Sequence, residues 1–228
     1  MAQRVGLAAV LAALLLPVGL SAAEQVTFSD RFDGDLSRWQ PLHAENWELR
    51  FVREDGLDNH ILALRNAPPL RPGVRRPAET LLVRDRRFSD VTIDVRARSL
   101  RPSTVVGRDV VVIFGYVDDL HFYYTHLSND SNGSTHNVIM KVNGDDPDPA
   151  KQRVTIHREK KPKPLLTDGW HPIRVEHHAD GAIRVFMDDL TTPLMTAQDT
   201  SYPAGQIGLA SFDDTAEFDD FEAVGTVG

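Results

Sequence analysis

The chain has 228 residues, no cysteine and a formal net charge of −8, from 25 lysines and arginines against 33 aspartates and glutamates. The lack of cysteine excludes disulfides, thiolate zinc sites, iron–sulfur clusters and a cysteine nucleophile. The acidic charge argues against nucleic acid as a partner, because non-specific binding needs many cations that face phosphates. An apolar share of 41% is enough for a packed core and argues against disorder.

Residues 1–23 have the features of a cleavable export signal. Arg4 supplies the positive start, residues 5–20 form an apolar run, and Ser21-Ala22-Ala23 places small residues at a cleavage site. We therefore expect a mature chain that begins at Glu24, is secreted or periplasmic in a bacterium, and has no membrane span after cleavage. An uncleaved membrane anchor is the alternative, but the apolar run is short for one.

Hydrophobic alternation with a period of two dominates the rest of the chain, and no segment has the pattern of a long amphipathic helix. Residues 91–98 alternate strictly, whereas residues 110–117 are continuously apolar and predict a central strand covered on both faces. Asp180-Gly181 predicts a hairpin turn. Further strands are predicted at residues 47–52, 61–64, 80–83, 122–127, 138–142, 153–159, 173–176, 183–188, 206–212 and 217–224.

About a dozen short strands with turn residues between them predict an all-β fold, an antiparallel β-sandwich or jelly roll. Residues 24–228 suit one such domain, since no linker or internal repeat interrupts them. Trp39 and Trp47 are expected in its core. We expect a monomer.

Three motifs of the mature chain resemble the concanavalin A-like lectin/glucanase superfamily. Phe28-Ser29-Asp30-Arg31-Phe32-Asp33-Gly34 with Trp39 resembles its opening strand, and residues 170–188 resemble its penultimate hairpin. Residues 205–224 resemble its last two strands. The likeness is closest to the secreted 3-keto-disaccharide hydrolase-like and LamG-like domains. The resemblance implies a β-sandwich fold and a carbohydrate ligand. It does not imply one activity, because the superfamily includes lectins, hydrolases, lyases and binding modules.

The resemblance also implies a structural calcium ion that joins the two chain ends. The matching ligands are the backbone carbonyls of Asp33 and Gly34 and the carboxylate of Asp219. Calcium prefers several hard oxygen ligands, which this acidic and turn-rich region can supply. The alternative is a set of turn-forming aspartates without an ion. No organic cofactor is expected.

Known catalytic motifs of related sandwiches are missing. The Glu-x-Asp-x-x-Glu pattern of laminarinase-type glucanases, which places two carboxylates across the scissile bond, does not occur. Neither the Tyr-x-Lys-x-Gly pattern of alginate-lyase jelly rolls nor a Gly-x-Ser-x-Gly elbow is present. The protein therefore either does not cleave glycans or uses a different set of residues.

The densest group of candidate side chains lies in residues 115–127 and 136–141. The expected catalytic residues are His121, Tyr123, His126 and His136. The expected substrate-binding residues are Arg108, Tyr116, Tyr124, Asn137 and Lys141. On an extended strand His121, Tyr123 and Thr125 share one face, which we expect to line a groove. Phe122, Tyr124 and His126 share the other, which we expect to face the core with His126 near its rim.

Three functions remain open for this group. One is β-elimination on a uronic acid polymer, with a cation on the carboxylate and His or Tyr as base and proton donor. A second is hydrolysis, with His121 or His126 as general base or as ligand of a divalent cation. A third is carbohydrate binding or cell-surface interaction without catalysis. The leading expectation is a glycan-cleaving enzyme, and basic loops at residues 66–77 and 160–164 favour an acidic poly- or oligosaccharide.

Overall fold

The computed structural model describes residues 24–54, 56–66, 69–130, 135–158 and 166–227. The expected signal segment, residues 1–23, and the basic stretch 160–164 lie outside the described residues. Within the described part of the chain, no helix is long and apolar enough to cross a membrane.

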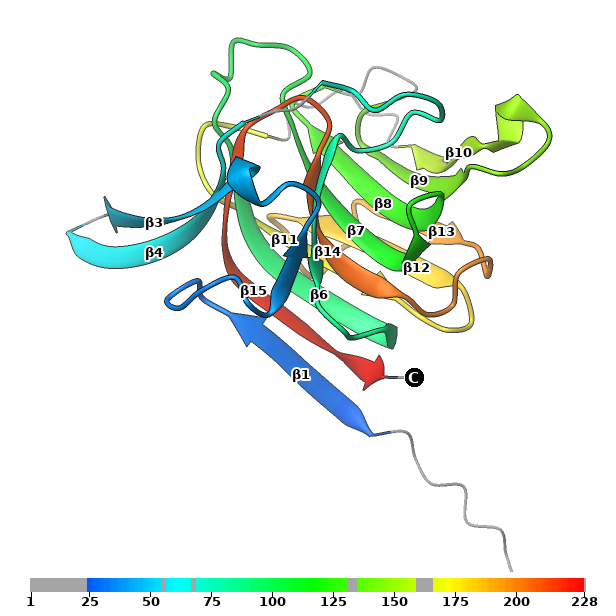
Figure 1. Ribbon diagram of the computed structural model, residues 1–228, viewed down its shortest axis with the longest axis horizontal. Coiled ribbons are helices and arrows are strands. Elements are labelled where there is room, and N and C mark those ends of the chain that lie inside the picture. Colours follow the sequence, from blue (N-terminus) through cyan, green and yellow to red (C-terminus); the bar gives the residue numbers. More distant parts are fainter. Residues whose placement is uncertain (1–23, 55, 67–68, 131–134, 159–165, 228) are drawn as a thin grey trace, which may run out of the picture.

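The described residues form two antiparallel sheets, which we call sheet A and sheet B. Sheet A has the order β13-β12-β11-β6-β15-β4-β3, and β1 pairs with β15 on the same side as β4. Its strands are β1 (Gln25–Asp30), β3 (Trp47–Glu54), β4 (Leu57–Leu64), β6 (Phe88–Ser99), β11 (His171–His177), β12 (Ala182–Met187), β13 (Met195–Gln198) and β15 (Ala216–Val227). Figure 1 shows β1 beside β15 and the β3–β4 hairpin projecting from the body.

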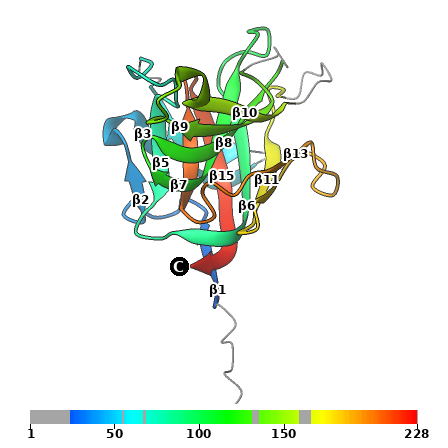
Figure 2. The ribbon, with the colours of Figure 1, turned by 90° about the vertical axis from the view of Figure 1, so that its right-hand side faces the viewer.

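Sheet B has the order β10-β9-β8-β7-β14-β5-β2. Its strands are β2 (Trp39–Pro41), β5 (Glu79–Val83), β7 (Asp109–Asp118), β8 (His121–Ser128), β9 (Val138–Asn143), β10 (Arg153–Arg158) and β14 (Gln206–Ser211). Figure 2 shows β10, β9, β8 and β7 following one another across this sheet. Two short 3-10 helices, η1 (Ala44–Asn46) and η2 (Pro149–Lys151), are the only helices in the described residues.

The strands predicted from hydrophobic alternation are all present, and the all-β sandwich is confirmed. β2 and β13 were not predicted, because three or four residues show too little alternation to be recognised. The hairpin between β11 and β12 is confirmed at Asp180-Gly181. Gly181 has φ +89°, and a Cβ there would lie 2.7 Å from the backbone oxygen of Asp199. Only glycine therefore fits this turn.

The main core lies between the sheets, and a second apolar cluster covers the outer face of sheet B. β7 contributes to both, since Val110, Val112 and Phe114 face the main core while Val111 and Ile113 face the outer cluster. This is the two-sided burial that its continuously apolar sequence predicts. Sheet B is thus covered on both faces around β7.

Both ends of the described chain meet in one aromatic contact within the main core. The Trp39 ring makes edge contacts with Phe28 from β1 and Phe221 from β15, at centroid distances of 5.3 and 4.9 Å. Trp39 and Trp47 are buried, as predicted. The pairing of β1 with β15 therefore rests on shared side-chain burial as well as on backbone hydrogen bonds.

Candidate functional site

β8 carries three of the four predicted catalytic residues, but its two faces are the reverse of the expectation. Tyr123 and Leu127 belong to the core between the sheets, whereas Phe122 and Tyr124 belong to the cluster on the outer face of sheet B. The His126 ring stacks on Phe212 of that outer cluster, with centroids 4.8 Å apart. Both faces of β8 are buried, so the polarity of its side chains could not tell them apart.

Tyr123 is a buried structural residue and not part of a groove. Its hydroxyl donates to Asp199 Oδ1 over 2.5 Å and accepts the backbone N–H of Tyr202 over 3.1 Å. Lys141 Nζ donates to the other Asp199 oxygen over 2.7 Å and to Ser201 Oγ over 3.0 Å. Burial, then the Asp199 hydrogen bond, holds the pKa of Tyr123 above its usual range. Lys141 and Tyr123 therefore tie β8 and β9 to the segment after β13.

Tyr123→Phe is expected to lower the free energy of unfolding by ~1–3 kcal/mol, because the Tyr202 N–H loses a buried acceptor. Denaturant unfolding measures this change. Tyr116→Phe is the matched control, since no hydrogen bond of the half-buried Tyr116 hydroxyl is found within the described residues. We expect unchanged ligand binding or turnover in Tyr123→Phe. A variant that folds stably but has lost turnover would show that Tyr123 takes part in catalysis.

His121 lies at the opposite end of β8 from His126. Its Nδ1 is 2.8 Å from Asp118 Oδ1, and its Nε2 is 2.9 Å from Asp145 Oδ1. Partial burial lowers the pKa of His121, but the hydrogen bonds with Asp145 and Asp118 outweigh it and raise this pKa overall. The structure does not bring His121 together with His126 and His136, because five residues of extended strand span ~16 Å. His121 is therefore not a candidate for the same site.

Arg108 and Asn137 hold loops in place rather than face an open groove. Arg108 is fully buried and donates from Nη1 to Asp168 Oδ1 over 2.5 Å and from Nη2 to the Ser99 carbonyl over 2.8 Å. Asn137 has φ +51°, and its Oδ1 accepts the Ser128 N–H over 3.0 Å. Both positions were expected to bind substrate, and the structure instead gives them intramolecular partners.

Tyr116 lies at one end of the outer face of sheet B. Its ring contacts Phe122 at a centroid distance of 5.4 Å. Burial, with a smaller effect of the Asp119 charge, raises the pKa of Tyr116 to about 12. Asp119 itself is paired with Arg71 and Arg76. Arginines of the basic loop at residues 66–77 are thus partly engaged with the protein's own acids.

His126 and His136 meet Asp109 at the other end of that face, and we call these residues the Asp109 cluster. His126 Nε2 is 2.7 Å from Asp109 Oδ2, and the two imidazole rings make an edge contact at 5.0 Å. His136 Nδ1 is hydrogen-bonded to Asp130 Oδ1. Asp109 and His126 are each 2% exposed. The structure therefore brings together two of the four predicted catalytic residues, from the end of β8 and the segment before β9.

Asp214 fixes the backbone beside this cluster. Its Oδ2 accepts the Asp109 N–H over 2.7 Å, and Arg101 is paired with Oδ1. Burial, and then the charge of Asp109, raises the pKa of Asp214 to about 6. The start of β7 is therefore a buried and strongly polar position.

A row of aromatic rings connects the Asp109 cluster with two arginines. Arg153 Nε donates to the Tyr124 hydroxyl over 2.8 Å. The guanidinium carbons of Arg75 and Arg153 lie 5.3 and 5.6 Å from the centre of the Phe212 ring. The Tyr124 and Phe212 rings are themselves 5.6 Å apart. Tyr124, predicted to bind substrate, therefore lies between a cationic pair and two histidines.

The sequence did not point to Asp109, Asp130 or Phe212 as site residues. It also did not show that Arg75 and Arg153 lie near the same aromatic ring. Asp109 carried a usable signal, since it is a carboxylate directly before the continuously apolar run at residues 110–117. Arg75 and Arg153 are 78 positions apart in the numbering, so only the tertiary structure shows that they meet over one ring.

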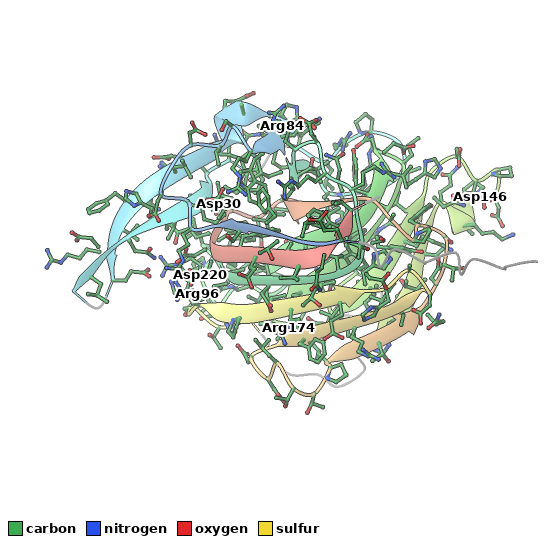
Figure 3. All side chains as sticks on the ribbon, turned by 90° about the horizontal axis from the view of Figure 1, so that it is seen from below. Asp30, Arg84, Arg96, Asp146, Arg174 and Asp220 are labelled. Carbon is green, nitrogen blue, oxygen red and sulfur yellow. The ribbon has the colours of Figure 1, made fainter. Side chains whose placement is uncertain are left out.

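The expected calcium corner brings Asp33 and Asp219 to the lining of one open pocket, while Gly34 lines the neighbouring one. Asp219 is buried, and its Oδ2 accepts from Asn59 Nδ2 over 2.9 Å and from Arg96 Nη2 over 2.5 Å. Arg96 also pairs with Asp220, and Figure 3 shows these two side by side. A guanidinium thus occupies the place beside Asp219 where a cation would bind, so these residues do not fit calcium well.

Comparisons with known proteins agree with the fold. No protein-family model and no curated protein sequence matches the chain. The structure of the cellulose-induced protein Cip1 is similar, with TM-score 0.53 and 13% identity, over 86% of this chain and 96% of that one. The carbohydrate-binding module CBM66 from Bacillus subtilis has TM-score 0.50 and 17% identity, over 78% and 94%.

A protein of unknown function from Shewanella oneidensis MR-1 has TM-score 0.51 and 12% identity, over 93% of this chain and 90% of that one. Identities this low establish a shared fold and leave the activity to be argued from the site. With the two-sheet topology, they show that this chain has the concanavalin A-like jelly-roll sandwich fold.

Proposed function

We propose that the protein binds an acidic poly- or oligosaccharide on the outer face of sheet B and cleaves it there as a polysaccharide lyase. The observation that carries the proposal is the pair Arg75 and Arg153 over Phe212. Neither arginine has a carboxylate partner within the described residues. In a protein of net charge −8, two such guanidinium groups near one ring provide a place for an anionic group.

The same residues suit β-elimination on a uronic acid unit. A base removes the proton from the carbon next to the carboxylate, the glycosidic C–O bond on the following carbon breaks, and a double bond forms between these carbons. A proton donor then neutralises the leaving oxygen. Guanidinium groups bound to the carboxylate stabilise the negative charge that develops in the transition state. No redox cofactor is needed.

Tyr124 is the proton-transfer group that the geometry favours. Burial raises the pKa of Tyr124 to about 12, and the charges of Arg153 and Arg75 oppose this effect. Its hydroxyl is 2.8 Å from Arg153 Nε, so a carboxylate held by Arg153 would lie close to it. His126 and His136 lie next along the same face, beyond Tyr124.

Substrate binding on this face requires a local rearrangement. Tyr124 and Phe212 are fully buried, and Val74 packs against their cluster while Arg75 covers Phe212. Val74 would have to move for a sugar to reach Tyr124, whereas the exposed Arg75 would stay near Phe212 and bind the carboxylate.

The second candidate is a carbohydrate-binding module without catalysis. The burial of Tyr124 and His126 favours it, as does the missing pair of catalytic carboxylates. In either case the N-terminal segment suggests export, so the glycan would be met in the periplasm or outside the cell.

A panel of uronic acid polymers and neutral polysaccharides tests these functions. New reducing ends together with the ultraviolet absorbance of unsaturated uronides are the result expected for a lyase. New reducing ends without that absorbance would replace the lyase by a hydrolase. Binding without either product would leave the binding module.

Arg153→Ala and Tyr124→Phe are each expected to lower kcat/KM on the active polymer by about 100-fold or more, through loss of charge stabilisation and of proton transfer. Arg184→Ala is the matched control, because Arg184 is an exposed arginine of sheet A paired with Glu176. Its kinetics should equal those of the unsubstituted protein. Wild-type kcat/KM in both site variants would place the chemistry elsewhere.

A further inference from the structure

The Asp109 cluster has the composition and spacing of a metal site. Asp109 begins β7, His126 lies near the end of β8, and His136 precedes β9. One ligand atom from each of the three lies within 4.8 Å of the other two. We propose that Asp109, His126 and His136 bind a divalent transition metal ion of the Zn²⁺ type. This site goes beyond the proposed function and does not depend on glycan cleavage.

Buried polar atoms without hydrogen bonds point to a missing ligand. Asp109 Oδ1 and both ring nitrogens of His126 are buried and have no hydrogen-bond partner among the described residues. His126 Nε2 is close to Asp109 Oδ2, at 2.7 Å, but the contact does not have hydrogen-bond geometry. Buried polar groups are nearly always satisfied in folded proteins. A metal ion would satisfy an imidazole nitrogen and the carboxylate together.

The surroundings of His136 orient it as a ligand. Its Nδ1 is hydrogen-bonded to Asp130 Oδ1, which leaves Nε2 for a metal. A carboxylate on the second nitrogen is the usual partner of a metal-bound histidine, because it fixes the ring and increases its basicity. Gly107 allows this ring position, since a Cβ there would lie 2.9 Å from His136 Cε1.

The backbone of the carboxylate ligand is fixed as well. Asp214 Oδ2 accepts the Asp109 N–H over 2.7 Å, and Arg101 balances the charge of Asp214. Two strands and two supporting carboxylates therefore hold the three ligands in place before any metal binds.

The ligand set selects the class of metal. Two imidazoles and one carboxylate suit Zn²⁺ and its first-row neighbours, whereas Ca²⁺ and Mg²⁺ prefer sites made of oxygen alone. Three protein ligands leave at least one coordination position for water or a substrate oxygen. The His126 ring lies 6.4 Å from the ring of Tyr124, so the proposed site adjoins the aromatic row that Arg153 also contacts.

Calorimetric titration of the tag-free, chelator-treated and dialysed protein with Zn²⁺, and separately with Ca²⁺, tests the site. We expect one equivalent of Zn²⁺ to bind and Ca²⁺ not to compete for it. Co²⁺ should bind with the visible absorption of a four- or five-coordinate ion. Failure of the unsubstituted protein to bind any of Zn²⁺, Co²⁺ or Mn²⁺ stoichiometrically would overturn the proposal.

Substitutions at the proposed ligands test where the ion binds. Asp109→Asn and His136→Gln keep the side-chain size and should each weaken Zn²⁺ binding more than Asp130→Asn, for which a loss of ~10–100-fold is expected. His121→Gln is the matched control, because His121 also contacts two carboxylates but lies at the other end of β8. It should bind Zn²⁺ as the unsubstituted protein does. Circular dichroism of the metal-free variants verifies folding, and wild-type affinity in both folded ligand variants would refute the site.

Discussion

Glu79→Ala is expected to destabilise the fold by about 2–5 kcal/mol, because it leaves buried donors without an acceptor. Glu79 is fully buried in β5, and its carboxylate accepts from Asn46 Nδ2 over 2.9 Å and from Trp47 Nε1 over 3.0 Å. It also accepts the His43 N–H over 3.1 Å. One carboxylate thus connects β5 of sheet B with η1 and with the start of β3 in sheet A.

Thermal unfolding at neutral pH measures this effect, and a fall in Tm of roughly 5–15 °C is expected for a domain of this size. Glu48→Ala is the matched control. Glu48 follows Trp47 in β3 but is half-exposed and, among the described residues, paired only with Arg65 at the surface, so its loss should cost less than ~1 kcal/mol. Equal Tm values for the two variants would show that the Glu79 contacts do not stabilise the sandwich.

Acid should destabilise the protein through His177. This residue of β11 is fully buried against the rings of Phe114 and Tyr123, and within the part of the chain that the structure describes neither of its ring nitrogens has a hydrogen-bond partner. Burial, with a smaller effect of His178, lowers the pKa of His177 from 6.5 to about 4. The unfolded chain therefore binds a proton between these pH values that the folded chain does not.

The direction of the change in the free energy of unfolding with pH follows from this lowered pKa. The contribution of neutral His177 is fully present above pH 6.5, falls as the pH decreases toward 4, and amounts to about 3 kcal/mol over that interval. Denaturant unfolding at several pH values measures it. His177→Leu should remove that part of the pH dependence, whereas His178→Leu, a partly exposed neighbour, should retain it. The same slope in both variants would assign the acid sensitivity to other groups.

The pattern of apolar residues was sufficient to predict the central strands of sheet B, but not to predict which face of the sheet each side chain occupies. In β7 the continuous apolar run correctly predicted burial on both sides, and Val110 and Val111 do point to different clusters. In β8 the same two-sided burial made the sequence misleading. Tyr123 is polar enough to suggest a groove, yet its hydroxyl reaches Asp199 at the edge of the core.

The structure brings only some of the predicted site residues together, for a physical reason. His126 and His136 were singled out because several histidines and tyrosines are close in sequence, and the pairing of β8 with β9 places His126 opposite Val138, two residues after His136. His121 satisfied the same criterion, but the length of β8 separates it from the other two. Asp109 lies on β7, which pairs with β8, and Arg153 lies on β10, which pairs with β9. The sequence does not reveal the register of either pair.

Length, charge and the absence of cysteine already determined much about this protein. They excluded disulfides and thiolate metal sites and argued against nucleic acid, and the period-two pattern determined an all-β sandwich, because a strand exposes alternate side chains to opposite faces. Tertiary structure decided what the charged residues do. It pairs Arg96 with Asp219 in the expected calcium corner, and leaves Arg75 and Arg153 without carboxylate partners among the described residues. It also joins Asp109 to two histidines, since strand pairing and register, not distance along the chain, set which side chains meet.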